Sequence, residues 1–202
     1  MKIISLGGVG GCILATALRE INQLAHPYDW LITAQSFIIT SFNNFDLFFK
    51  FNTKEVHDKT KLITENKNGI MLHDFKNFEL ERENVIQKYK RRFERLNDNL
   101  NSNEDILFVR IYDNSKNETA GSPELFCREN EDLKKWETFI LFLQQKYSNK
   151  KIRLLIITNC KDIYNDELKN ISICMIKDRS DMNEIKSIIE NNIKKEWINY
   201  KL

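Results

Sequence analysis

Apolar and polar segments alternate along the chain in a way that predicts buried strands between amphipathic helices. Short apolar runs bounded by polar or turn-forming residues predict fully buried strands at 106–112, 152–158 and 171–176. Apolar residues spaced three and four apart predict helices at 81–96, 130–147 and 182–197. Near-continuous apolar strands between helices are typical of a parallel sheet covered on both faces. We therefore expect a single α/β domain over residues 1–202, with a mostly parallel sheet and helices on both faces.

The start of the chain predicts a strand, a glycine-rich turn and a helix. A short apolar run at 3–6 predicts the strand, which leads into four of the six glycines of the chain, namely Gly7, Gly8, Gly10 and Gly11. From Cys12 onward apolar residues recur at helical spacing. Pro27 closes this unit, because the residue before a proline is displaced from the helical region.

The next segments are less regular. The phenylalanine-rich stretch 37–51 predicts a core helix, and the polar stretch 57–68 predicts a loop or an edge. Residues 69–75 predict a short strand that runs into a polar tip containing His73 and Asp74. The stretch 113–124 predicts a long loop.

Composition and charge exclude several classes of function. The 31 Lys and Arg residues nearly balance the 29 Asp and Glu residues, for a formal net charge of +2. A nucleic-acid-binding protein needs a strongly basic face, so we expect no nucleic-acid partner. No apolar run approaches the roughly 18 residues of a membrane span, and the first residues lack the apolar core of a secretory signal. We expect a cytoplasmic protein without a membrane partner.

The cysteines favour thiol chemistry over a metal centre. They stand far apart and form no C-x-x-C pair, at positions Cys12, Cys127, Cys160 and Cys174. This spacing argues against a zinc site of the usual type, and we expect neither a metal nor another cofactor. In a reducing compartment these residues are reduced thiols, and one of them is a candidate for reactivity.

The glycine-rich turn has two interpretations, and the first is nucleotide binding. Backbone N–H groups and the helix dipole make a strand–turn–helix junction a good anion site. The dinucleotide fingerprint, however, needs a third glycine or an alanine where this chain has Ile13. The acidic residue expected about 20 positions later is missing, and no Lys-Ser/Thr pair follows to form a P-loop. Nucleotide binding is therefore the weaker interpretation.

The second interpretation is that the turn mounts a reactive thiol. Cys12 stands where the glycines lead into the helix, and a helix N-terminus lowers the pKa of a thiol from its usual value of about 8.5. The same N–H groups stabilise an oxyanion after the thiolate attacks a carbonyl. Gly10 and Gly11 would let a substrate approach the backbone closely. The alternative is a small buried cysteine at a strand–helix junction, and position alone does not separate the two.

A cysteine nucleophile needs a base, usually a histidine, and the chain has His26, His57 and His73. His73 follows a predicted strand. Strand ends meet helix N-termini at one edge of an α/β sheet, so we expect His73 and Cys12 at the same edge. The polar surroundings of His57 predict a solvated residue, and nothing specific marks His26.

Five motifs in order resemble those of a known family. They are SLGGVGGCILATAL at 5–18, HPYDW at 26–30, HDF at 73–75, KYKRRFERL at 88–96 and ILFVRIY at 106–112. These motifs resemble those of the putative papain-like cysteine peptidases of bacteria and large DNA viruses, also called domain of unknown function 1796. The family motifs, in the same order, are S-L-G-x-x-C-x-x-A-x-x-L, P-F-D-W, H-D-F, a basic helix and F-V-R. The resemblance is clearest over residues 1–112. One departure is a gap before Cys12 that is two residues longer than usual for the family.

The resemblance implies a cysteine hydrolase. Cys12 would be the nucleophile and His73 the general base that takes its proton. A third group would hold the imidazole in the right tautomer, and Asp29 and Asp74 are the candidates. Adjacent strand residues point to opposite faces, which slightly favours Asp29 over the neighbour of His73, although an aspartate in such a turn often caps its own backbone.

The remaining matched residues would surround the substrate. Trp30 would be a core residue or a wall of the cleft, and Arg110 would bind a substrate carboxylate or a structural acid. The helix with Arg91, Arg92 and Arg95 predicts a solvated charged face. We expect a thiol hydrolase acting on an acyl or amide bond of a peptide or small acyl substrate. The alternatives are a non-catalytic ligand- or protein-binding protein and nucleotide binding at the turn.

Overall fold

A computed structural model of the protein describes residues 1–8, 11–21, 23–49, 51–52, 62–64, 69–71, 75–112, 131–163, 168, 170–178 and 180–198. Five residues singled out in the sequence lie outside these ranges: Gly10, His57, His73, Asp74 and Cys127.

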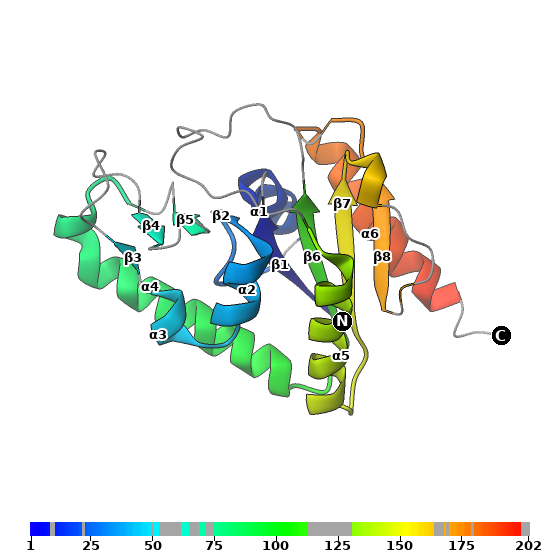
Figure 1. The fold of residues 1–202 in the computed structure, drawn as a ribbon, viewed down its shortest axis with the longest axis horizontal. Helices are drawn as coiled ribbons and strands as arrows, with labels where there is room; N and C mark the ends of the chain where they lie inside the picture. Colours follow the sequence, from blue (N-terminus) through cyan, green and yellow to red (C-terminus); the bar gives the residue numbers. More distant parts are fainter. Residues whose placement is uncertain are drawn as a thin grey trace.

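The central sheet is entirely parallel, which confirms the α/β fold (Figure 1). Its strands lie in the order β1 (Lys2–Gly8), β6 (Ile106–Tyr112), β7 (Ile152–Thr158) and β8 (Ile171–Met175). The three apolar runs of the sequence form β6, β7 and β8 as predicted. The two middle strands pair along their whole length, and burial on both faces explains why they show no polar alternation.

Helices cover both faces of the central sheet, also as predicted. Successive strand residues point to opposite faces, so Phe108 of β6 enters one core and Val109 enters the other. Residues of α4 (Phe78–Asn101) and α5 (Leu133–Lys146) complete the first core. Residues of α1 (Gly11–Glu20) and α6 (Met182–Ile198) complete the second. A short 3-10 helix, Lys161–Ile163, follows β7.

A second sheet, which the sequence did not predict, is antiparallel and lies beyond β1 in Figure 1. Its strand order is β2 (Leu31–Thr33), β5 (Gly69–Met71), β4 (Leu62–Thr64) and β3 (Phe51–Asn52). The expectation that the strand before His73 ends at the edge of the parallel sheet is therefore wrong, because β5 pairs antiparallel with β2 and β4. Strands of two and three residues are too short for their apolar pattern to specify a partner.

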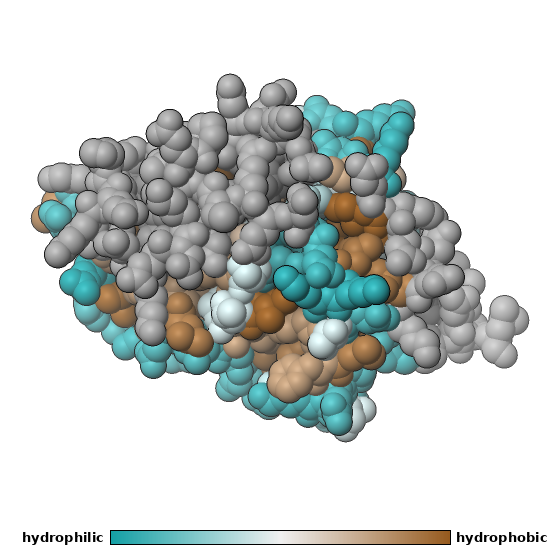
Figure 2. All heavy atoms as spheres, viewed as in Figure 1, coloured by the Kyte–Doolittle hydropathy of each residue, from teal (hydrophilic) through white to brown (hydrophobic). Residues whose placement is uncertain are grey.

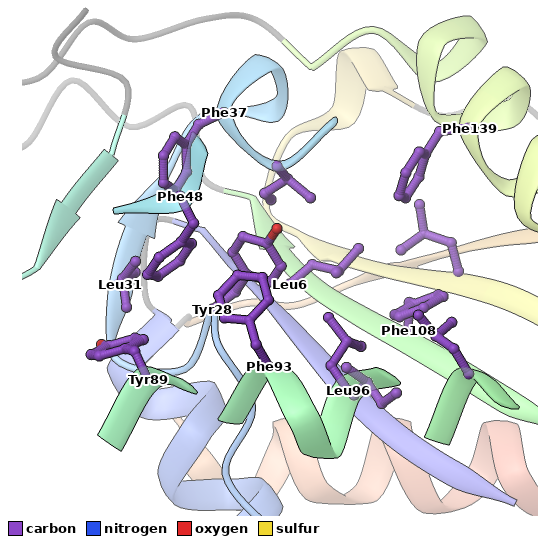
Figure 3. Close-up of a cluster of buried hydrophobic side chains, with 14 of the residues drawn as sticks. Leu6, Tyr28, Leu31, Phe37, Phe48, Tyr89, Phe93, Leu96, Phe108 and Phe139 are labelled. Carbon is purple, nitrogen blue, oxygen red and sulfur yellow. The ribbon is translucent and has the colours of Figure 1, made fainter. Parts of the chain in front are cut away.

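The phenylalanine-rich segment forms two short helices where one was predicted. Between α2 (Gln35–Ser41) and α3 (Phe45–Phe48), Asn43 has a left-handed φ of 52° and the Asn44 side chain caps α3. The rings nevertheless enter the core, where Phe37 and Phe48 surround Tyr28 together with Phe93 of α4 (Figure 3).

Helix α4 is longer than the predicted 81–96 because polar side chains satisfy both of its ends. Asn77 accepts hydrogen bonds from two N–H groups of the first turn. At the other end, the buried Lys150 ammonium donates to three carbonyl oxygens. In Figure 1 this long helix runs below the second sheet toward the lower end of the central sheet, and its Asn99 forms a hydrogen bond with His26 in the turn at residues 26–30.

Candidate active site

Cys12 lies in the first turn of α1, directly after the carboxyl end of β1. Its side chain is half-buried, and its Sγ lies 3.8 Å from the carbonyl oxygen of Trp30, which suits a weak S–H hydrogen bond. N–H groups in a first helical turn have no partner within the helix, and the helix dipole is positive at this end. Cys12 therefore lies among groups that stabilise negative charge, beside one carbonyl oxygen that opposes it.

The glycines before Cys12 allow backbone to pack against backbone. A Cβ on Gly8 would lie 1.9 Å from the carbonyl oxygen of Ile111, and one on Gly11 would lie 2.5 Å from that of Leu31. Gly7 and Gly8 also have φ values of +66° and +116°, which only glycine adopts without strain. These contacts fix the start of α1 against β2 and β6.

The turn at residues 26–30, whose Trp30 carbonyl contacts Cys12, is stabilised by its own polar groups. Asp29 Oδ2 accepts a hydrogen bond of 2.9 Å from the His26 N–H, so Asp29 caps its own turn. Trp30 has a φ of 66°, which is uncommon for a bulky residue. The Arg19 guanidinium lies 4.8 Å above the Trp30 ring. The turn thereby holds the Trp30 carbonyl against the thiol.

Asp29 is a buried carboxylate with one unused oxygen. The residue is 3% exposed, and its Oδ1 accepts no hydrogen bond within the described part of the chain. Burial raises the pKa of Asp29 to about 6, although the His26 amide, the Arg92 guanidinium and the nearby Ser5 hydroxyl favour its charged form. Perturbed carboxylates of this kind cluster at functional sites.

His26 has a structural role. Its Nε2 accepts a hydrogen bond of 2.8 Å from the Asn99 amide of α4. Burial and the neighbouring Arg95 lower the pKa of His26 to about 4, so the imidazole is neutral at pH 7. The ring therefore joins the turn to α4 as an uncharged acceptor.

The solvated face expected on α4 is wrong for two of the three arginines assigned to it. Arg92 is 6% exposed and lies over the Tyr89 ring, and Arg95 donates to the carbonyl oxygen of Ala25. The 26–30 turn lies against this face, so both guanidinium groups contact protein atoms instead of pointing into solvent. Arg91 is exposed, as expected.

Arg110 is buried beneath the glycine turn, where the protein itself uses all of its donors. A guanidinium has five N–H groups. Arg110 makes two hydrogen bonds to Glu131, two to Thr33 and one to the Leu6 carbonyl oxygen. Of the two partners considered for Arg110, the structural acid is present here as Glu131, and both side chains are at most 2% exposed.

Glu131 did not stand out in the sequence. It precedes α5, and the Trp136 indole N–H donates to its second carboxylate oxygen. The available signal was Arg110 itself, since a buried arginine in a strand requires an acid. No spacing rule selects one partner from the 29 acids of the chain.

Several elements thus converge on the thiol. Cys12, Asp29 and Trp30 lie around the start of α1, with Gly11 against Leu31. Strand β5 reaches the same place, because its last residue, Met71, pairs with Leu31. The other expected site residues, His73, Asp74 and Gly10, lie outside the described residues.

No three His, Cys, Asp or Glu side chains in the described ranges converge as metal ligands. No helix in those ranges has the length and apolar character needed to cross a membrane.

A comparison with protein-family models bears on this site. Residues 1–142 of the 202 match the family described as "Putative papain-like cysteine peptidase (DUF1796)". No curated protein and no solved structure matches the chain. The family match includes the glycine turn, the 26–30 turn, α4 and β6. The protein therefore belongs to the DUF1796 family of putative papain-like cysteine peptidases.

Proposed function

We propose that the protein is a cytoplasmic thiol hydrolase that cleaves an acyl or amide bond in a peptide or small acyl substrate. The observation that carries the proposal is the place of Cys12, in the first turn of α1 and beside the strand pair that leads to His73. Membership of the family supports the same assignment.

His73 is the general base in this proposal. Met71 pairs with Leu31, and the residue before Leu31 is Trp30, whose carbonyl lies against the Cys12 thiol. Two residues of extended chain span at most about 7 Å, so position 73 is within a short reach of this strand end. In this proposal the β2–β5 pair, and not the edge of the parallel sheet, brings His73 close to Cys12. A base must come within hydrogen-bond reach of the thiol, directly or through one water.

The reaction follows from these roles. His73 takes the thiol proton, and the Cys12 thiolate attacks the substrate carbonyl carbon to give a tetrahedral oxyanion. N–H groups at the start of α1, including those of Gly11 and the proposed substrate contact Gly10, stabilise that oxyanion. The imidazolium then protonates the leaving group. Water, deprotonated by His73, hydrolyses the resulting thioester and restores the thiol.

Asp29 is the better candidate to orient His73. Its Oδ1 is buried without a hydrogen bond in the described region, which leaves an acceptor for an imidazole N–H. Its other oxygen accepts the His26 amide hydrogen bond, which helps to hold the orientation of the carboxylate. Asp74 is the alternative. Trp30, half-buried under Arg19, is proposed as a wall of the substrate cleft.

Alkylation of the native protein with iodoacetamide at pH 6, followed by peptide mass spectrometry, tests the proposal. An ordinary thiol with a pKa of about 8.5 reacts slowly at this pH. We expect Cys12 to react at least about tenfold faster than Cys160 and Cys174, and His73→Gln to remove this advantage. In parallel, Cys12→Ala should abolish turnover of a peptide and p-nitrophenyl ester panel, whereas Cys160→Ala should retain it.

A non-catalytic binding protein is the second candidate. The Trp30 carbonyl oxygen at 3.8 Å favours the protonated form of the Cys12 thiol, which is the observation in its support. Cys12 reacting no faster than Cys160 in the folded protein would support this candidate and refute the hydrolase. Nucleotide binding has less support, because Ile13 stands where the dinucleotide fingerprint needs its third glycine or an alanine.

A further inference from the structure

An open groove of about 580 Å³ lies between α2 and α5, over the face of the central sheet opposite α1. It is mainly apolar, with two lysines at one end, and is lined by Ile39, Phe42, Lys134, Lys135, Thr138, Phe139 and Phe142. The side of the molecule seen in Figure 2 carries brown and tan surface beside teal side chains over these elements. None of these residues belongs to the motifs around Cys12, so the groove is separate from the thiol.

The groove has the form of a preformed docking surface. Gln35 at the start of α2 pairs with both backbone polar groups of Asp132, at 2.7 and 3.0 Å, which locks the start of α5 against α2. Phe42 and Phe139 meet edge to face with their ring centres 4.9 Å apart. Walls that are fixed in advance reduce the entropic cost of binding.

The dimensions favour a polypeptide over a small ligand. The lining residues of α5 run from Lys134 to Phe142, which is about 12 Å at 1.5 Å per residue. That length suits four extended residues or two helical turns of a partner. Phe142 is 57% exposed, so the groove is too open to enclose most of a small molecule.

The charge at one end of the groove indicates an acidic partner. Lys134 and Lys135 occupy the first turn of α5, where the helix dipole disfavours cations, and the carboxylate of the N-cap residue Asp132 binds their backbone N–H groups. By contrast, α4 begins with Glu79 and Glu81. No described residue forms an ion pair with either lysine. The two ammonium groups thus do not stabilise their own helix, and they line the groove without an ion pair to any described carboxylate.

We propose that this groove binds an acidic segment of a partner protein. A bulky apolar side chain of the segment packs between Phe42 and Phe142, and its carboxylates pair with Lys134 and Lys135. The surface is independent of the thiol chemistry, and it holds whether or not Cys12 is catalytic.

Fluorescence anisotropy with the Cys12→Ala protein tests the groove without interference from cleavage. The probe is a fluorescein-labelled ten-residue peptide in which glutamates flank a leucine–phenylalanine pair. Matched peptides carry lysines in place of the glutamates, or serines in place of the apolar pair. We expect the acidic apolar peptide to bind best, and its affinity to fall as salt is raised.

Variants locate the binding. Lys134→Glu/Lys135→Glu should weaken it about tenfold, and Phe142→Ser about fivefold, with unchanged circular dichroism. The matched charge reversal Lys161→Glu/Lys177→Glu, on exposed lysines outside the groove, should change affinity less than about twofold. Equal binding of the lysine peptide, or no effect of either groove variant, overturns the proposal. Tight binding of decanoate or phosphatidylglycerol vesicles that the peptide does not displace also overturns it, in favour of a lipid site.

Discussion

At the scale of single residues, the surroundings of Cys12 contain ionisable groups in unfavourable places. Asp29 is a buried acid with an unused oxygen, and His26 is a buried imidazole kept neutral. Groups of this kind lower the free energy of unfolding and persist where the surrounding structure or a function requires them. For His26 the requirement is the hydrogen bond to Asn99, and for Asp29 we propose the orientation of His73.

Asp29 and His26 should make the free energy of unfolding depend on pH in opposite directions. The pKa of Asp29 rises from 3.8 to about 6 on folding, so ionisation costs stability as the pH rises through that range. The pKa of His26 falls from 6.5 to about 4, so its contribution is lost as the pH falls through that range. Each effect is on the order of 3 kcal/mol, and in the wild type they largely cancel.

Replacing one of the two groups should reveal the pH dependence of stability that the other one causes. The stability of Asp29→Asn should rise as the pH rises from 4 to 6.5, whereas that of His26→Gln should fall over the same range. Urea unfolding midpoints at several pH values measure both slopes. Parallel profiles for the two variants would show that these groups do not titrate as described.

Some features of the candidate site could be predicted from sequence and others could not. The position of Cys12 at the start of α1 followed from local order alone, because glycines after a strand and before a helical pattern specify where a helix begins. The buried state of Arg92 did not, because its own helix is polar and the turn that covers it lies over 60 residues earlier in the chain. Contacts between distant segments leave no mark in local periodicity.

At the scale of elements, Arg110 joins four pieces of structure at one point. It extends from β6 and binds β1 through Leu6, β2 through Thr33 and the start of α5 through Glu131. A buried ion pair contributes little relative to an apolar pair, but removing one partner leaves an uncompensated charge. The cluster therefore specifies how the two sheets meet more than it adds stability.

A double-mutant cycle should separate these contributions. Glu131→Gln or Arg110→Met alone should lower the free energy of unfolding by about 3–5 kcal/mol, whereas the double variant should lose less than the sum. Chemical denaturation measures the cycle. In the folded double variant, Cys12 should keep its reactivity. Retained reactivity with loss of turnover would instead indicate that Arg110 binds substrate.

Predictability also depends on the length of an element. The strands at 106–112 and 152–158 were predicted with the bounds they have, because a seven-residue run that is mostly apolar has few other solutions. The strands β2 to β5 have two or three residues each, and β2 was not predicted at all. Their pairing depends on the packing of α2, α3 and α4 around them, which no local pattern encodes.

At the scale of the whole molecule, Cys12 lies where a well-supported sheet meets a marginal one. The central strands β6 and β7 are paired on both sides and almost fully buried. In the second sheet, β2 and β5 share three residue pairs. Short, sparsely paired strands open locally at low cost, and such regions supply the moving parts of binding sites. The thiol is thus held on the rigid side while its proposed base follows a strand on the looser side.

Hydrogen exchange should distinguish the well-paired central strands from the sparsely paired strands of the second sheet. Amides of β6 and β7 should exchange slowest, and those at 31–33 and 69–71 faster by local opening. Alkylation of Cys12 with a peptidyl vinyl sulfone should slow exchange at 31–33 and 69–71, because an occupied cleft stabilises the β2–β5 pair. The edge strand β8 should not change, and Cys12→Ala treated with the same reagent provides the control. Protection confined to β8 and α6 would mean that the ligand contacts the other side of the molecule. The ligand bound at Cys12 would then not contact the β2–β5 pair. That result would remove the structural basis for pairing Cys12 with His73.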